Sequence, residues 1–354
     1  MNATKVPDLQ QMQREAPDHI RFYDPAQTPF AIYGVTPPDE SDDRFRRLPR
    51  ETAARVSDVT AALYANTAGG RIRFRTDAKH LRIRAFLPNL TTMAHFAQSG
   101  ISGFSVYAKA QGGADRFMGI YVPGEPVFER EFDLGAPELK EITIYLPLYN
   151  DVSRVYLGLD RDARVLPDGG YLYEKPVVFY GSSITQGGCA SRPGADYEAM
   201  LSRQLGFDYV NLGFSGGAKG ETAMADYIKT LPMQAFVMDY DHNAPTPEHL
   251  ARTHEAFFRI IRAACPALPV LFVSRPCPHR DEDSRRRFAI IRRTYENAVR
   301  DGDGRVRLVD GGDFFASAVD LNDPTVDMTH PTDLGFFLMA QGLAPVLREA
   351  LNQI

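Results

Sequence analysis

The stretch PVVFYGSSITQGG, residues 176–188, joins a short apolar run to a loop of small residues. The run 177–180 is wholly apolar or aromatic, which is typical of a strand buried on both faces. Two adjacent serines, Ser182 and Ser183, follow it between glycines. The stretch by itself allows two interpretations: a structural turn of small residues, or a loop in which one serine is a nucleophile.

The chain continues from this stretch with the same kind of unit, repeated. Four further apolar runs lie at 209–212, 235–238, 270–273 and 306–309, the last interrupted by Arg307 and therefore predicted nearer an edge. Two amphipathic helices are predicted from apolar residues at helical spacing: Leu250, His254, Phe257, Phe258 and Ile261 in one, and Phe288, Ile291, Tyr295 and Ala298 in the other. Apolar strands that alternate with such helices predict a parallel sheet covered on both faces.

The first half of the chain has a different pattern. Polar and apolar residues alternate with period two in short segments, among them 71–75, 81–86, 104–108, 142–145 and 155–159, and glycine-rich turns such as 68–70, 111–113 and 168–170 separate them. This pattern predicts an all-β, jelly-roll-like sandwich with few helices. We therefore expect two domains, 1–172 and 173–354, which suits a length of 354 residues.

Composition narrows the classes of function. With 44% hydrophobic and 24% charged residues the chain resembles an ordinary globular protein, and a formal net charge of -5 argues against nucleic-acid binding. Three cysteines, without a CxxC pair, form neither a disulfide framework nor a zinc motif. No run of 18 apolar residues and no apolar N-terminal segment occurs, so we expect no membrane partner and a cytoplasmic location.

Polar residues follow the predicted strands, at the sheet edge where α/β proteins bind their ligands. These loops are 181–187, 211–217, 239–243 and 326–335, and together they contain a serine hydroxyl, a glycine turn, an amide, a carboxylate and an imidazole. Serine hydrolysis needs this set, because an imidazole must activate the hydroxyl, a carboxylate must orient the imidazole, and hydrogen-bond donors must stabilise the oxyanion.

The ordered blocks Gly-Ser-Ser-Ile at 181–184, Asn-x-Gly-x-Ser-Gly at 211–216, an Asn after the third strand and Asp-x-x-His at 327–330 resemble the SGNH, or GDSL-type, hydrolase superfamily over residues 174–354. The resemblance implies a flavodoxin-like, three-layer α/β/α fold that needs no metal or organic cofactor. It implies Ser183 as nucleophile, His330 as general base and Asp327 as its orienting carboxylate. It also implies an oxyanion hole made by Ser183, Gly216 and Asn243.

This chain departs from the family pattern at two places. Ser182 stands where the name-giving Asp lies, and the third block reads Asp-His-Asn-Ala at 241–244 in place of Gly-x-Asn-Asp. In the first half, Gly-Phe-Ser-Val-Tyr at 103–107 resembles a degenerate Gly-x-Asp-Leu-Tyr motif. That motif marks a β-sandwich domain that precedes some SGNH hydrolases. An α/β-hydrolase elbow is excluded, because Thr185 stands where its second glycine would be.

Several residues keep a second interpretation. Asp-x-x-His occurs three times, at 77–80, 239–242 and 327–330, and only the third has the chain order of the family. Gly216 and Gly217 could form a helix-entry turn, and Asn243 could cap a helix. Asp239, Asp241 and His242 alternate in direction along the chain, which is poor geometry for a metal, and no metal site is predicted.

Three further residues are candidates for the substrate pocket: His242, Arg192 and Tyr197. For Arg192 and Tyr197, a surface role is at least as good an interpretation. Cys189 is interpreted as filling its loop. The expected function is a serine esterase acting on a small-molecule or oligosaccharide ester, first of all a carbohydrate O-acetyl esterase. The alternatives are a lipase, an acyltransferase, and a carbohydrate-binding protein with a vestigial site. The oligomeric state stays open, a homo-oligomer included.

Overall fold

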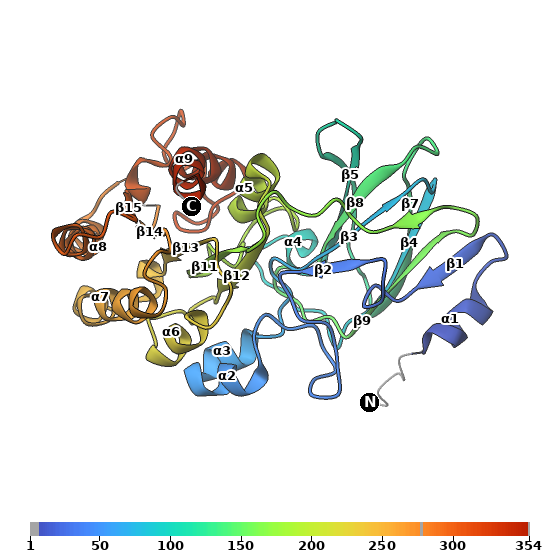
Figure 1. The fold of residues 1–354 in the computed structure, drawn as a ribbon, viewed down its shortest axis with the longest axis horizontal. Helices are drawn as coiled ribbons and strands as arrows, with labels where there is room; N and C mark the ends of the chain where they lie inside the picture. Colours follow the sequence, from blue (N-terminus) through green and yellow to red (C-terminus); the bar gives the residue numbers. More distant parts are fainter. Residues whose placement is uncertain (1–6, 277–278, 353–354) are drawn as a thin grey trace.

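The computed structural model describes residues 7–276 and 279–352, so Cys277 lies outside the described residues. Figure 1 shows two parts side by side: a β-sandwich built from the first half of the chain, and a sheet flanked by helices built from the second. Both parts of the predicted fold, the antiparallel sandwich and the parallel α/β domain, are confirmed.

The sandwich consists of two antiparallel sheets that enclose one apolar core. One sheet has the order β1 (Ile20–Tyr23), β9 (Arg154–Asp160), β4 (His80–Phe86), β7 (Val127–Asp133). The other has the order β10 (Val165–Leu166), β3 (Arg71–Thr76), β8 (Lys140–Tyr145), β5 (Phe104–Ala110), β6 (Arg116–Tyr121), with β2 (Ala31–Tyr33) paired to β3. Alternate residues of β4 are buried, as the period-two pattern predicted, and Leu81 and Ile83 are fully enclosed.

The second half forms a five-stranded, wholly parallel sheet. Its order is β12 (Tyr209–Gly213), β11 (Val177–Gly181), β13 (Ala235–Asp239), β14 (Val270–Val273), β15 (Val306–Val309), and β15 lies at an edge as the interruption at Arg307 predicted. Chain order 2-1-3-4-5 is the flavodoxin-like arrangement, in which the first strand lies between the second and the third. The loop after β11 is therefore flanked by the ends of β12 and β13.

Helices cover both faces of this sheet (Figure 1). The packed pair α5 (Tyr197–Leu205) and α9 (Asp333–Leu351) lies on one face, and the series α6 (Thr222–Ile228), α7 (Pro247–Ala264) and α8 (Glu282–Arg300) lies on the other. Short 3-10 turns, η1 (Asp241–Asn243) and η2 (Gly311–Asp313), follow β13 and β15. The predicted helix faces are buried, including Phe257 and Ile261 of α7 and Ile291 of α8.

The helix α9 is the one helix among the described residues that is long and apolar enough to cross a membrane. Half of its apolar window is buried inside the structure, where Phe336, Met339 and Leu343 belong to the core under the sheet. A core helix passes the same test of length and composition, so this observation carries little weight for a membrane partner.

The core does not divide at residue 172. The N-terminal half contributes four short helices: α1 (Leu9–Glu15), α2 (Arg50–Val56), α3 (Asp58–Leu63) and α4 (Gln98–Ser102). Of these, α2 packs against α6, and Ala53 belongs to the same apolar cluster as Phe214 of the second half. Arg71 is fully buried, forms an ion pair with Asp208 and lies 3.9 Å from the centre of the Tyr209 ring. The sandwich is thus held firmly against the end of the sheet where β12 lies.

Candidate active site

Close packing shapes the loop after β11. At Gly181, a Cβ atom would come within 2.0 Å of Thr185 Oγ1 and 2.4 Å of the Asp239 carbonyl oxygen, so only glycine fits. The Ser182 hydroxyl accepts from the Ile184 N–H at 3.2 Å, and its carbonyl accepts from the Gln186 N–H at 3.0 Å. Ser182 therefore serves the turn itself, whereas the next serine has a different partner.

Ser183 lies beside the imidazole of His330. The distance from Ser183 Oγ to His330 Nε2 is 3.0 Å, and His330 Nδ1 lies 2.8 Å from Asp327 Oδ2. The other carboxylate oxygen of Asp327 accepts from the backbone N–H of His330 at 2.8 Å. Because Nδ1 donates to the carboxylate, Nε2 carries the free lone pair that faces the serine hydroxyl.

The environment keeps Asp327 charged. Partial burial by itself would raise the pKa of this carboxyl, but the backbone and ring hydrogen bonds from His330 outweigh it and hold the pKa below its usual value. An ionised Asp327 accepts two hydrogen bonds from His330 at once, which fixes both the orientation and the tautomer of the ring.

The three Asp-x-x-His segments differ in their hydrogen bonds. In the first, Asp77 accepts from Arg164 at 2.6 Å, while His80 pairs with Asp160. In the second, the Asp239 carboxylate accepts from the Tyr197 hydroxyl at 3.1 Å. The third segment, with Asp327, makes the carboxylate–imidazole hydrogen bond within itself.

The predicted oxyanion donors lie on neighbouring loops. Gly216 is exposed with φ +67°, and a Cβ atom there would meet no heavy atom within 4 Å. Asn243, at the end of η1, donates from Nδ2 to the carbonyl of Phe214 at 2.9 Å. This bond ties the third loop to the second, close to Gly216 in the chain. The structure therefore brings both residues to the sheet edge at which Ser183 lies.

His242 is a mostly buried imidazole next to this arrangement. Its Nδ1 has no hydrogen-bond partner within the described part of the chain. Burial, with the nearby positive charges of Arg275 and Arg287, lowers the pKa of His242 to about 4. His242 is thus neutral at neutral pH, so it carries no positive charge that would pair with the Asp327 carboxylate in place of His330.

The two acidic residues near His242 in the chain, Asp239 and Asp241, form hydrogen bonds with different partners. Burial raises the pKa of Asp239 well above its usual value, and this carboxyl faces Tyr197 and Thr185. Asp241 accepts from the backbone N–H of Arg275 at 3.0 Å, and burial raises its pKa to about 6. The three side chains considered as metal ligands from the sequence do not converge.

Two of the expected pocket residues, Tyr197 and Arg192, lie in different environments. Tyr197 is fully buried at the start of α5, with its ring 5.8 Å from that of Phe179, so it lies in the core below the sheet edge and does not line an open pocket. The reason is that the first turn of α5 faces the sheet. Arg192 is part-exposed, with its guanidinium 4.4 Å from the centre of the Phe117 ring and 3.5 Å from Asp333.

The N-terminal half supports the serine loop directly. The Tyr149 hydroxyl donates to the Ser183 carbonyl at 3.0 Å. Gln186 donates to Asn66 Oδ1 at 3.1 Å and accepts from the Ser215 N–H at 2.9 Å, so it joins the sandwich half to the loop after β12. No local pattern in the sequence distinguishes these residues from ordinary core residues.

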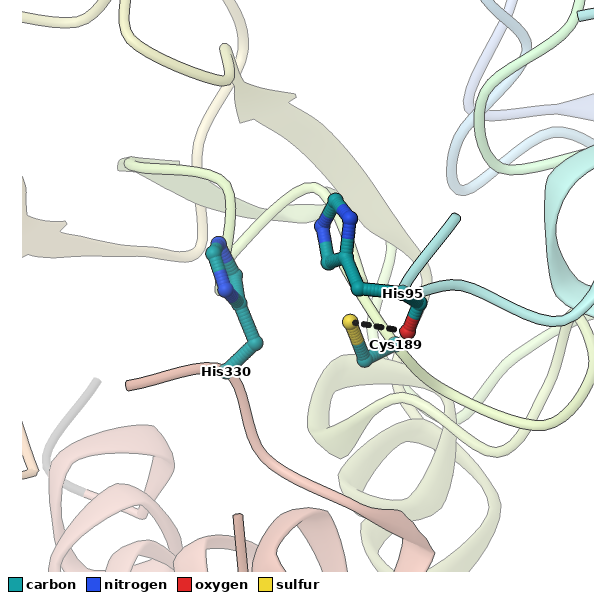
Figure 2. A group of neighbouring side chains, drawn as sticks. All are labelled: His95, Cys189 and His330. Carbon is teal, nitrogen blue, oxygen red and sulfur yellow. Dashed lines mark hydrogen bonds between the residues drawn. The ribbon is translucent and has the colours of Figure 1, made fainter. Parts of the chain in front are cut away.

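His95 and Cys189 complete the mouth of the site (Figure 2). His95 is exposed in the segment between β4 and α4, and its ring centre lies 5.5 Å from that of His330. Cys189 has φ +73°, and its Sγ lies 3.6 Å from the His95 carbonyl oxygen. Burial, with the negative charge of Asp327, raises the pKa of the Cys189 thiol to about 12, so the thiol is protonated and not a nucleophile. Nothing in the sequence links His95 to this site.

Two protein-family models match this chain. Residues 174–348 match the model of the GDSL-like lipase/acylhydrolase family, and residues 20–165 match the GxDLY model, described as the N-terminus of SGNH-hydrolase-type esterases. The resemblance based on 103–107 is thereby confirmed for the domain as a whole. Among curated protein sequences, none matches this chain.

Solved structures share the whole two-domain fold. A GDSL-like lipase candidate from Bacteroides ovatus is 26% identical with a TM-score of 0.83, covering 94% of this chain and 98% of that one. A salicylyl-acyltransferase from a tetracycline biosynthetic pathway is 19% identical with a TM-score of 0.77, covering 95% and 100%. A family two carbohydrate esterase from Clostridium thermocellum is 12% identical with a TM-score of 0.63, covering 93% and 100%. The chain belongs to the GDSL-like lipase/acylhydrolase (SGNH) family of hydrolases and carries an N-terminal GxDLY domain.

Proposed function

We propose that this hydrolase cleaves carboxylic esters through an acyl-enzyme formed on Ser183. The observation that carries the proposal is the continuous hydrogen-bonded series from Ser183 Oγ to His330 Nε2, at 3.0 Å, and from His330 Nδ1 to Asp327 Oδ2, at 2.8 Å. In the first step Oγ attacks the ester carbonyl while Nε2 takes the hydroxyl proton. The protonated His330 then gives that proton to the leaving alcohol.

Deacylation repeats these steps with water. His330 removes a proton from the water, the resulting hydroxide attacks the acyl carbonyl, and the proton returns to Ser183 Oγ as the carboxylic acid leaves. We assign the oxyanion to the backbone N–H groups of Ser183 and Gly216 and to Asn243 Nδ2. The exposed, left-handed Gly216 and the amide of Asn243 next to its loop support this assignment.

For the substrate we propose an acetylated carbohydrate. The reacting groups lie where the two halves of the molecule meet, with the polar side chain of His95 exposed beside His330, so a substrate there can contact both halves. The fold-level likeness to family two carbohydrate esterases, of which one from Clostridium thermocellum was solved with cellohexaose, agrees with this choice.

Acyl transfer is the second candidate. It uses the same acyl-enzyme and differs only in the acceptor, and the salicylyl-acyltransferase shares the two-domain fold with this chain. Adding an acceptor alcohol and separating transfer product from free acid distinguishes the two. A vestigial site is disfavoured because Ser183, His330 and Asp327 are held at hydrogen-bonding distances.

The test is a panel of p-nitrophenyl acetate, butyrate and palmitate together with acetylated xylan and acetylated glucomannan. We expect acetate to be the preferred acyl group, and Ser183→Ala to lower kcat by at least about 10⁴-fold. Ser182→Ala is the matched control, since its hydroxyl serves the turn, and it should keep most of the activity. Full activity in Ser183→Ala would disprove the mechanism, and preference for palmitate would disprove the substrate class.

A further inference from the structure

Two imidazoles and a thiol gather at the mouth of the site. The metal-binding atoms of His95, Cys189 and His330 all lie within 4.8 Å of one another, and Figure 2 shows the three side chains around one space. They come from three segments: the loop between β4 and α4, the serine loop, and the turn before α9. We propose that these residues bind one Zn²⁺ ion, and that the bound ion inhibits the enzyme by occupying His330, an inhibition that rests on the function proposed above.

The donor set suits this metal. Zn²⁺ prefers imidazole nitrogen and thiolate sulfur in tetrahedral geometry, with bonds of about 2.0–2.1 Å and 2.3 Å, so its ligand atoms lie roughly 3.3–3.7 Å apart. Closing the present separations to that range takes movements of about 1 Å. His95 is exposed and can make most of that movement by rotating its side chain. The three residues leave the fourth position for water.

His330 is already arranged as a metal ligand. Histidines that bind zinc commonly donate their second ring N–H to a carboxylate, which fixes the tautomer and strengthens the ligand. Asp327 receives such a bond from Nδ1 at 2.8 Å, so Nε2 is the nitrogen that is free to bind an ion. Its present partner is the neutral hydroxyl of Ser183, at 3.0 Å, which Zn²⁺ would displace.

The Cys189 thiol is also positioned to bind the ion. Its Sγ lies 3.6 Å from the carbonyl oxygen of His95, so two of the three ligand residues are already in contact. The thiol is protonated in the metal-free protein, and a coordinated cation displaces that proton to leave the thiolate. Cys265, in contrast, packs on the opposite face of the sheet, where α6, α7 and α8 lie, and its Sγ is 3.9 Å from the Lys229 carbonyl oxygen.

The consequence for catalysis follows from one lone pair. The lone pair of His330 Nε2 must accept the proton of Ser183, and an ion bound there removes it from use. The ion would also join the N-terminal half, through His95, to the catalytic half. Zn²⁺ should therefore abolish turnover and, because it binds the folded state, stabilise the fold at the same time.

Binding is tested with Co²⁺ as the spectroscopic probe and the full-length chain. We expect one equivalent to bind with a near-ultraviolet thiolate-to-cobalt charge-transfer band. Cys189→Ser should lose the band. His95 is exposed, so His95→Asn should leave the fold intact. Because it removes a ligand, it should weaken Co²⁺ binding by roughly 100-fold, which is the upper end of the loss seen when an outer-shell partner of a metal ligand is removed. Cys265→Ser is the matched control and should keep both band and affinity.

The second measurement is inhibition by Zn²⁺ of p-nitrophenyl acetate hydrolysis, relieved by EDTA. Wild type and Cys265→Ser should be inhibited at the same concentration, and His95→Asn and Cys189→Ser only at far higher concentrations. Equal inhibition of all four proteins, or a Co²⁺ complex without a charge-transfer band, would overturn the proposal. The Co²⁺ titration does not depend on turnover, so an inactive but metal-binding wild type would refute the esterase mechanism and leave the metal site standing.

Discussion

Replacing Asp327 by asparagine is expected to remove most of the activity and leave the fold intact. Asp327 Oδ1 accepts from the backbone N–H of His330 at 2.8 Å and Oδ2 accepts from the ring Nδ1 at 2.8 Å. Asparagine retains the first acceptor, but it places an N–H₂ group where the second acceptor stood. Two donors then meet, unless the imidazole moves its proton to Nε2.

That change of tautomer is the source of the loss. An Nε2–H cannot accept the proton of Ser183, so the base is blocked although every atom keeps its place. Loss of the correct tautomer is worth about 10³- to 10⁴-fold in kcat, or about 4–5.5 kcal/mol of transition-state stabilisation. The Asp327 side chain is 38% exposed, so the stability change is small and Tm should move by less than about 3 °C.

The assay is kcat and KM for p-nitrophenyl acetate together with thermal unfolding. Asp77→Asn is the matched control, because it makes the same change in another Asp-x-x-His segment whose carboxylate binds Arg164. The control should keep wild-type activity. Asp327→Asn activity within about tenfold of wild type, at unchanged Tm, would refute the role of the carboxylate.

Three further predictions concern the loops and the core. Asn243→Ala should lower kcat by about 10²-fold with little change in KM, measured on p-nitrophenyl acetate, and an unchanged kcat would remove Asn243 from the oxyanion hole. Tyr149→Phe removes the 3.0 Å hydrogen-bond partner of the Ser183 carbonyl, so it should lower the free energy of unfolding by about 1–2 kcal/mol. It should also lower kcat, but less than Asp327→Asn does. Denaturant titration and kcat measure the two effects, and no change in either quantity would contradict the prediction. His254 is fully buried, and burial lowers its pKa to about 3, below the unfolded value near 6.5. The unfolded state therefore binds the extra proton, so this residue contributes stability above about pH 6.5 that is lost as the pH falls toward 3. His254→Gln should make the loss of stability between pH 7 and 4.5 smaller by about 2–3 kcal/mol in urea titrations, and an identical pH dependence would contradict the burial argument.

The fold was largely predictable because each half has its own periodicity. The apolar runs at 177–180 and 235–238 lie in β11 and β13, and the five predicted segments of the first half lie in β3, β4, β5, β8 and β9. Burial on two faces produces continuous apolar runs and burial on one face produces alternation, so sequence alone separates the two sheet types. The packing of α2 against α6 was not predictable, since it joins elements far apart in the chain.

The catalytic candidates follow from patterns that are visible in the sequence. Ser183, Gly216, Asn243 and the segment 327–330 each follow a strand or precede a helix, and parallel strands bring their carboxyl ends to one edge whatever the remaining packing. Strand order and residue type place these loops at one edge, and the resemblance to the SGNH pattern implies the role of each residue.

The neighbours of those candidates depend on the tertiary packing. It placed Tyr197 in the core, because the first turn of α5 faces the sheet, and it brought Tyr149 and His95 of the sandwich to Ser183 and His330. Such contacts depend on how two separately patterned halves pack against each other. That packing arises from buried surface and paired charges distributed along the whole chain, and no local pattern records it.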